Sequence, residues 1–207
     1  MVEPRLVEVQ PVEPRPVQAG ASGIAGVVLT GGSSRRMGMD KALIQIDGRA
    51  MVDRVGDALR AAGCSTVVAI GPSRLAGGLQ PVDDLYPGEG PLGGILTAMA
   101  TLSSGAELVF VLACDLPSID GGTIQELARA AREATETGGV DVIMARTDRL
   151  EPLCAIWNPR CAPALQAAFD SGERAIHSAL NELTVIFVEV PPETLRNVNT
   201  PDDLPTL

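Results

Sequence analysis

Glycines, serines, arginines and one lysine follow the first strongly apolar run of the chain. The apolar run covers residues 24–29, and the polar loop after it ends at Lys41. A strand that ends in such a loop presents backbone N–H groups and cations to an anion, and a nucleoside triphosphate is the best candidate. Gly31 and Gly32 carry no Cβ, so the backbone can approach a ligand closely there. The stretch therefore predicts a phosphate-binding loop.

This loop matches neither of the two common phosphate-binding motifs. A Walker loop requires Gly-Lys-Ser/Thr, whereas Lys41 stands between Asp40 and Ala42. Residues 31–33 do not provide the dinucleotide motif G-x-G-x-x-G either. A glycine- and serine-rich loop with solvated arginines remains the purely structural alternative. The pattern that is present reads L-x-G-G-x-S-x-R-M-G-x-D-K, and it is filled by Leu29, Gly31, Gly32, Ser34, Arg36, Met37, Gly38, Asp40 and Lys41.

A carboxylate follows another strongly apolar strand. Residues 108–113 predict this strand, and the segment C-D-L-P at residues 114–117 comes directly after it. In open α/β sheets, ligands bind at the carboxyl ends of the strands. Asp115 is therefore the best metal ligand in the chain, since Mg²⁺ prefers hard oxygens and takes one or two carboxylates plus substrate phosphates. Capping of the following turn is the structural alternative for Asp115.

Two other segments have the composition of functional loops. Residues 83–94 contain glycines and prolines ahead of a helical apolar pattern that begins at Ile95, and free N–H groups at a helix N-terminus favour anions. The length of this loop favours function over an ordinary surface loop. Residues 197–204 (N-V-N-T-P-D-D-L) have the residue types of a helix N-terminus, with Thr200 as the expected N-cap and Pro201 at the first helical position.

The composition excludes several classes of protein. The chain has 207 residues, 45% of them hydrophobic, and one domain with one substantial core is expected. A formal charge of -10 argues against a nucleic-acid partner, and one Trp, one Tyr and three Phe offer no obvious stacking platform for single strands. No apolar run is long enough for a transmembrane helix, so no membrane partner is expected.

The cysteines and the single histidine carry no chemistry in this interpretation. Four cysteines lack C-x-x-C spacing and are best explained as buried free thiols of a reducing cytosol: Cys64, Cys114, Cys154 and Cys161. A structural zinc site is not favoured, because the chain has one histidine. His177 lies in an expected helix away from any nucleophile motif, which disfavours Ser-His-Asp and Cys-His catalysis. A cytoplasmic protein is expected.

Hydrophobic periodicity predicts alternating strands and helices. Strands are expected at residues 24–29, 66–70, 79–82, 108–113, 140–145, 153–157 and 184–190, and helices at residues 51–62, 95–102, 120–137, 159–169 and 173–183. This alternation is typical of an α/β fold with a mostly parallel sheet. Residues 1–22 are rich in proline and charge and repeat V-E-P-R, so they are expected to form a disordered arm ahead of a single domain, residues 23–207.

Four separated segments, residues 29–41, 84–94, 114–117 and 197–204, together resemble one family in order along the chain. The resemblance is to the molybdenum cofactor guanylyltransferases, which are nucleotidyltransferases of glycosyltransferase-A-like fold. It implies a three-layer, Rossmann-like sandwich of the nucleotide-diphospho-sugar transferase type. It also implies transfer of GMP from GTP to molybdopterin with release of diphosphate, and molybdenum-dependent apo-enzymes as receivers of the product.

The resemblance also implies the roles of individual residues. Lys41, Arg36 and Asp115 would be catalytic, and Asp115 would hold Mg²⁺. The nucleotide would contact Leu29, Thr30, Gly31, Gly32, Lys41, Asp84, Gly93, Asp115, Asn197 and Asn199. Asp83 is the near alternative to Asp84. Family members can carry an asparagine after the second strand, but this chain has I-G-P at residues 70–72, so a contact there would come from the backbone.

The chemistry of this reaction fits the residues present. The nucleophile would be a terminal phosphate that already carries about -1.5 to -2 charge, so no general base is needed. Positioning and charge neutralisation suffice. Guanine is expected over cytosine, because Gly32 and the pair Gly93-Gly94 would leave room for a purine. The alternatives are a cytidylyltransferase of the same cofactor or of a sugar phosphate, and a catalytically silent nucleotide-binding regulator.

Overall fold

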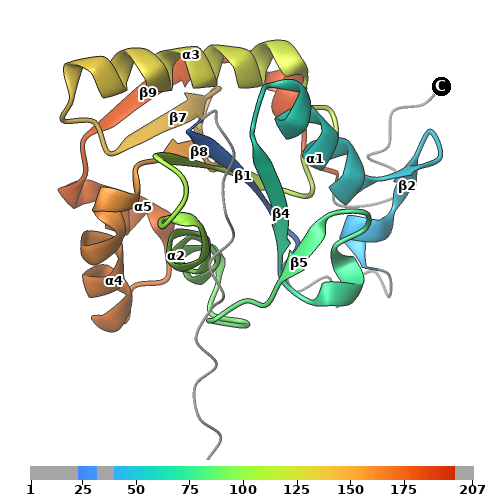
Figure 1. The fold of residues 1–207 in the computed structure, drawn as a ribbon, viewed down its shortest axis with the longest axis horizontal. Coiled ribbons are helices and arrows are strands. Elements are labelled where there is room, and N and C mark those ends of the chain that lie inside the picture. Colours follow the sequence, from blue (N-terminus) through green and yellow to red (C-terminus); the bar gives the residue numbers. More distant parts are fainter. Residues whose placement is uncertain (1–22, 32–39, 199–207) are drawn as a thin grey trace, which may run out of the picture.

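The computed structural model describes residues 23–31 and 40–198, and the rest of the chain is not described. Its centre is a seven-stranded sheet in the order β5-β4-β1-β6-β8-β7-β9 (Figure 1). The strands are β1 (Ile24–Leu29), β4 (Thr66–Ile70), β5 (Gln80–Val82), β6 (Leu108–Ala113), β7 (Val142–Arg146), β8 (Leu150–Trp157) and β9 (Val185–Glu189).

Strand β8 is the antiparallel member of this sheet. It pairs antiparallel with both β6 and β7, whereas β1 pairs parallel with β4 and β6, and β9 pairs parallel with β7. The carboxyl ends of β5, β4, β1 and β6 therefore lie along one edge of the sheet. This confirms the predicted α/β fold with a mostly parallel sheet.

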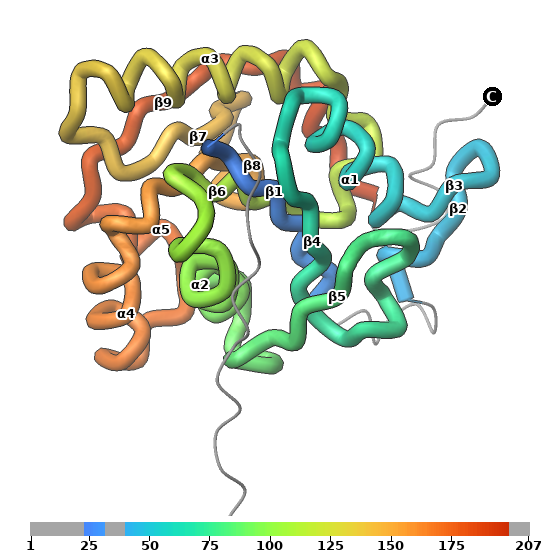
Figure 2. The backbone as a smooth tube through the Cα atoms, in the orientation of Figure 1, coloured from blue at the N-terminus to red at the C-terminus, as the bar shows by residue number. Residues whose placement is uncertain are grey.

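Helices cover both faces of the sheet and make it the middle of three layers (Figure 2). One face is covered by α1 (Met51–Ala61) and α3 (Gly121–Thr137), and the other by α2 (Pro91–Leu102), α4 (Ala162–Asp170) and α5 (Ile176–Ala179). Short 3₁₀ helices connect these elements at Lys41–Leu43, Ser73–Leu75, Pro159–Cys161, Leu180–Glu182 and Pro192–Leu195. Buried residues of β6 alternate between the two layers, with Phe110 on the α1/α3 side and Val111 on the α2 side.

A small hairpin joins the first loop to α1. Its strands are β2 (Gln45–Ile46) and β3 (Arg49–Ala50), and the turn residues Asp47 and Gly48 have φ of 52° and 74°. A two-residue hairpin loop of type I′ requires positive φ at both central residues. Ile46 of the hairpin packs in a small buried cluster with Val198, which places Val198 beside the hairpin.

Strands β1, β4 and β6 have the bounds that the sequence predicts, while two other elements begin earlier than expected. Helix α2 begins at Pro91 instead of after Gly94, because proline suits the first helical position and Gly90 precedes it with φ of 83°. Strand β8 begins at Leu150, because residues 147–149 form a tight hairpin turn that pairs Arg146 with Leu150. Among the described residues, no helix combines the length and apolarity needed to cross a membrane.

Candidate functional site

The end of β1 is tied to both neighbouring strands. The N–H and the Oγ1 of Thr30 both donate to the carbonyl of Ile70 on β4, at 2.9 and 3.0 Å. On the other side, the N–H of Cys114 donates to the carbonyl of Leu29 at 3.1 Å. Thr30 is buried and Gly31, the next residue, is exposed. The sheet therefore holds Gly31 at its carboxyl edge with a fixed backbone.

Gly71 is required by the packing at this edge. Its φ is 135°, and a Cβ at this position would lie 2.5 Å from Thr30 Oγ1 and 3.1 Å from the Gly31 nitrogen. Its N–H donates to the carbonyl of Val82 at 3.1 Å, so this donor is already used in the sheet. The structure thus gives a steric reason for glycine at position 71.

Lys41 and Asp115 form an ion pair at the same edge. Lys41 Nζ lies 3.8 Å from Asp115 Oδ2, and the two side chains are 22% and 24% exposed. Burial raises the pKa of the Asp115 carboxyl above its ordinary value, while the positive charge of Lys41 opposes that rise. The structure therefore brings two of the predicted catalytic residues together.

Asp84 lies at the end of β5 and faces the first loop. Its Oδ2 is 4.0 Å from the position that a Cβ on Gly31 would occupy. Its Oδ1 accepts hydrogen bonds from the N–H of Tyr86 at 3.0 Å and from the hydroxyl of Thr97 at 2.9 Å. Asp83, the alternative, is exposed. The carboxylate of Asp84 is thus oriented by this chain's own groups, with one oxygen toward Gly31.

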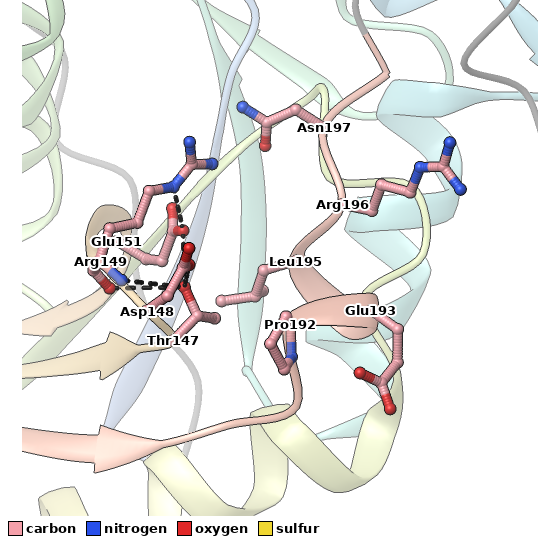
Figure 3. Close-up of a pocket in the computed structure, with 9 residues that line it drawn as sticks. All are labelled: Thr147, Asp148, Arg149, Glu151, Pro192, Glu193, Leu195, Arg196 and Asn197. Atoms are coloured by element: carbon pink, nitrogen blue, oxygen red, sulfur yellow. Dashed lines mark hydrogen bonds and ion pairs between the residues drawn. The ribbon is translucent and has the colours of Figure 1, made fainter.

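The C-terminal segment closes the other side of Asp115. The N–H of Val198 donates to the carbonyl of Asp115 at 3.0 Å, which places Asn197 next to this centre. Asn197 also lines a cavity of about 340 Å³, which we call the hairpin cavity (Figure 3). The cavity lies between the β7–β8 hairpin and the segment after β9, and its lining residues are Thr147, Asp148, Arg149, Glu151, Pro192, Glu193, Leu195, Arg196 and Asn197.

One buried charge lies in the wall of the hairpin cavity. The Glu151 side chain is 13% exposed, and its Oε1 accepts from Arg149 Nε at 2.7 Å and from Thr147 Oγ1 at 3.3 Å. The negative charge of Glu151 contributes to the raised pKa of Asp115, so the cavity and the Asp115 centre are electrostatically connected. Figure 3 shows Leu195 and Thr147 pointing toward each other across the space, whereas Glu193 and Arg196 point away.

Comparison with known proteins identifies the family. A family model described as a MobA-like NTP transferase domain matches residues 26–185. The chain belongs to the MobA-like NTP transferase family. It is 35% identical over 192 residues to a probable molybdenum cofactor guanylyltransferase of Pelotomaculum thermopropionicum, a match that covers 86% of this chain and 89% of the relative. It is 32% identical to the molybdenum cofactor guanylyltransferase of Rhodobacter capsulatus, with 87% and 93% covered.

Solved structures agree with this family assignment. The chain is similar to molybdopterin-guanine dinucleotide biosynthesis protein A from Archaeoglobus fulgidus, with a TM-score of 0.68, 25% identity and coverage of 86% and 94%. A nucleotidyl transferase from Methanothermobacter thermautotroptrophicus has the same fold, with a TM-score of 0.67, 18% identity and coverage of 88% and 94%. The fold is therefore that of the nucleotidyltransferases, and this MobA-like chain is a nucleotidyltransferase.

The later glycine pair of this MobA-like domain has a packing role. A Cβ on Gly93 would lie 2.7 Å from Tyr86 Cβ, and a Cβ on Gly94 would lie 3.2 Å from Leu29 Cδ2. The space beside these glycines is thus filled by Tyr86 and Leu29, which corrects the expectation that the pair leaves room for a purine. The glycines instead let the first turn of α2 approach the end of β1 and the loop that carries Asp84.

The donor set at Asp115 fits Mg²⁺. Within residues 23–31 and 40–198, no three His, Cys, Asp or Glu side chains lie close enough together to enclose a metal ion. Mg²⁺ commonly binds through one or two carboxylates and completes its coordination with waters and substrate phosphates. A single half-buried carboxylate at the edge of the sheet suits this habit better than it suits Zn²⁺, which takes three or four protein ligands.

The thiols of the domain are not candidate nucleophiles. All four cysteines are free, as expected, with Cys64 half-buried and the others buried. Burial raises the pKa of Cys64, Cys114 and Cys161 to about 12, so these groups are protonated thiols at neutral pH. This agrees with the interpretation of the cysteines as inert core residues.

Three predicted site residues, Gly32, Arg36 and Asn199, lie outside the described residues. Sequence reasoning also missed two features that the structure places at the site. Thr97 is fully buried within α2 and its hydroxyl holds Asp84, and a threonine among the apolar residues of this helix was the available sign. The hairpin cavity had no comparable sign, because it forms only where residues 147–151 meet residues 192–197.

Proposed function

We propose that this MobA-like enzyme transfers GMP from GTP to molybdopterin and releases diphosphate. The observation that carries the proposal is the Lys41–Asp115 pair, at 3.8 Å, beside the exposed backbone of Gly31 at the carboxyl edge of a parallel sheet. The names of relatives such as the Rhodobacter capsulatus enzyme support guanine as the base and the molybdenum cofactor as the acceptor. Molybdenum-dependent apo-enzymes would receive the product.

The reaction needs charge neutralisation more than proton transfer. A terminal phosphate oxygen of the acceptor forms a bond to the α-phosphorus of GTP, and the bond from that phosphorus to the bridging oxygen of the β-phosphate breaks. Lys41 binds the triphosphate, and the backbone N–H groups at Gly31 and Gly32 hold its oxygens. Asp115 would hold Mg²⁺, which when bound neutralises charge on the phosphates. Arg36 would contribute a further positive charge to the triphosphate.

Asp84, Gly93 and Asn197 complete the proposed nucleotide contacts, together with Leu29, Thr30 and Asn199. Asp84 supports this role because its Oδ2 faces Gly31. Asn197 stands between Asp115 and the hairpin cavity, so its amide can contact groups on either side. The hairpin cavity is the proposed place of the acceptor, since Asn197 in its wall precedes Val198, which is hydrogen-bonded to Asp115. Its walls are both charged and apolar.

We further propose a single catalytic domain over residues 23–207, preceded by an arm that makes no contribution to catalysis. We also propose a cytoplasmic location. The four free cysteines support it, because a reducing compartment preserves thiols.

The proposal is tested with a panel of GTP, CTP and ATP, each with Mg²⁺ and with or without molybdopterin. Diphosphate release should require molybdopterin and should favour GTP by more than about tenfold in kcat/KM, since unpaired polar groups reject the wrong base strongly. Equal use of CTP would indicate a cytidylyltransferase instead. Triphosphate binding without any turnover would indicate a nucleotide-binding regulator.

A further inference from the structure

The loop that carries Asp84 contains a tight turn whose two ends point toward the α4–α5 region. The N–H of Glu89 donates to the carbonyl of Tyr86 at 3.1 Å, and Gly88 has φ of 84°. Proline at the second position and glycine with positive φ at the third are typical of a type II turn. The turn therefore projects Tyr86 from its first position and Glu89 from its last.

One end of this turn contacts residues of α4, and the other end contacts Arg174, which follows α4. The rings of Tyr86 and Phe169 have centroids 4.7 Å apart, and the hydroxyl of Tyr86 donates to Gln166 Oε1 at 3.1 Å. Glu89 Oε2 accepts from Arg174 Nε at 2.6 Å, although the two residues are 85 positions apart in the chain. We call this arrangement of Tyr86, Glu89, Phe169 and Arg174 the brace.

Within the brace, Arg174 contacts both Phe169 and Glu89. Its guanidinium carbon lies 3.9 Å from the centroid of the Phe169 ring. Its Nη1 donates to the carbonyls of Phe169 and Glu173, both at 2.8 Å. These contacts fix the plane of the guanidinium, so its Nε–H is already aimed when it meets Glu89. A pre-organised arginine loses less side-chain freedom when it forms such a contact.

The brace is directly connected to Asp84. The N–H of Tyr86, at the first position of the turn, donates to Asp84 Oδ1 at 3.0 Å. On the other side of the loop, Gly93 of α2 lies so close that a Cβ there would meet Tyr86 Cβ at 2.7 Å. Any displacement of the turn therefore moves the donor that orients the Asp84 carboxylate toward Gly31.

We propose that Arg174 is a positioning residue for the nucleotide: through Glu89 and Phe169 it holds the turn at residues 86–89, and the turn orients Asp84. The inference rests on the proposed function in one respect, namely that Asp84 contacts the nucleotide. It predicts that a side chain after α4, which belongs to no motif of the nucleotide loop, sets the affinity for GTP.

The chain contains a matched control for this arginine. Arg146 donates from Nε to Glu189 Oε1 at 2.6 Å, and its guanidinium carbon lies 5.0 Å from the centroid of Phe187. Arg146 and Glu189 are 45% and 65% exposed, against 41% and 51% for Arg174 and Glu89. Both arginines thus have an ion pair and a ring contact, but Arg146 lies at the β7–β9 edge and does not touch the loop of Asp84.

The test compares Arg174→Ala with Arg146→Ala in the full chain. Calorimetry should show GTP bound about three- to tenfold more weakly by Arg174→Ala and with unchanged affinity by Arg146→Ala. In steady-state assays Arg174→Ala should raise KM for GTP with kcat nearly unchanged. Arg174→Lys keeps the charge but not the planar face, so its affinity should fall between those of Arg174→Ala and the wild type.

Hydrogen exchange provides a readout that needs no nucleotide. Amides of residues 84–90 should exchange faster in Arg174→Ala than in the wild type or in Arg146→Ala. Equal exchange in all three proteins would overturn the inference, and so would faster exchange with unchanged GTP affinity. Failure of the wild-type enzyme to transfer GMP to molybdopterin would overturn the proposed function instead, and the exchange comparison would still decide whether the brace holds the loop.

Discussion

The two sides of Asp115 are built in different ways. On one side, which we call the strand-end edge, Thr30, Gly31, Gly71 and Asp84 lie at the ends of β1, β4 and β5, and Gly31 is the exposed member of this group. Backbone groups dominate there, and neighbouring atoms fill the space where side chains would be at Gly71 and at Gly93. On the other side, the hairpin cavity is lined by charged, polar and apolar side chains from residues 147–151 and 192–197.

This difference separates two kinds of mutational effect. At the strand-end edge, an added methyl group displaces backbone, so a substitution disturbs the geometry of the whole loop. The hairpin cavity is lined by side chains of the turn and of the segment after β9, so we expect that these side chains can be exchanged without moving strands. We therefore expect the edge to determine nucleotide affinity and the cavity to determine acceptor affinity, with Asp115 serving both.

The largest effect is expected at Asp115, where the two sides meet. Asp115→Ala should lower kcat by about 10³-fold, because charge stabilisation of the transferred phosphoryl group is lost. It should also abolish the Mg²⁺ dependence of GTP binding in calorimetry.

Asp120→Ala is the matched control. Asp120 accepts from the N–H of Thr123 at 2.7 Å as the N-cap of α3, so its loss should lower the stability of the protein by about 1 kcal/mol and leave kcat unchanged. Near-normal turnover in Asp115→Ala would remove Asp115 from the mechanism.

A large effect is expected at the strand-end edge for Gly93→Ala. Its new methyl group would meet Tyr86 Cβ at 2.7 Å, so stability should fall by about 1–3 kcal/mol. KM for GTP should rise about tenfold, while KM for molybdopterin should be little changed. Gly121→Ala is the control, because a Cβ there meets nothing within 4 Å at the start of α3. It should stabilise the protein by up to about 1 kcal/mol. Equal thermal stability of the two variants would contradict the packing argument.

A smaller effect is expected for Arg149→Ala in the hairpin cavity, and it should fall on the acceptor instead of on the nucleotide. Arg149 neutralises the largely buried Glu151, so its loss leaves an uncompensated negative charge where an anionic acceptor is proposed to bind. KM for molybdopterin should rise about threefold to tenfold, with KM for GTP unchanged. Arg129→Ala removes the exposed ion pair with Glu133 on α3 and should change neither constant. A rise in KM for GTP alone would reverse the assignment of the two sides.

The smallest effect is expected for a change outside both the strand-end edge and the hairpin cavity. Deletion of residues 1–22 should leave the melting temperature and both KM values nearly unchanged, since a proline-rich, charged segment buries little apolar area. Thermal melts and steady-state assays of the shortened and full-length proteins measure this directly. A drop of many degrees would show that the arm packs on the domain.

Much of this architecture could be predicted because it depends on local pattern. The apolar runs at Ile24–Leu29 and Leu108–Ala113 are bounded by glycine or by polar residues, so even their ends were predictable. Asp115 could be proposed as a site residue because a carboxylate after a buried parallel strand lies at the ligand-binding edge. Lys41 and Asp84 were proposed from motifs, and the structure places both side chains at that edge.

Other features depend on contacts between distant segments, and only the tertiary structure decided them. The reason for glycine at position 71 is the hydroxyl of Thr30, and the reason at position 93 is Tyr86; neither neighbour can be identified from local sequence. The ion pair between Glu89 and Arg174 joins residues 85 positions apart. Hydrophobic periodicity reports which face of an element is buried, and it does not report which side chain of another element lies against that face.

The class of fold, the polar loops at the strand ends and the residue types available for phosphate chemistry could all be inferred from the amino-acid sequence. The tertiary structure decided which of these loops touch, that Val198 joins the C-terminal segment to Asp115, and that a cavity opens beside it. The physical reason is that secondary structure follows from short-range backbone geometry and burial, whereas a site forms from side chains that chain folding brings together across long sequence separations.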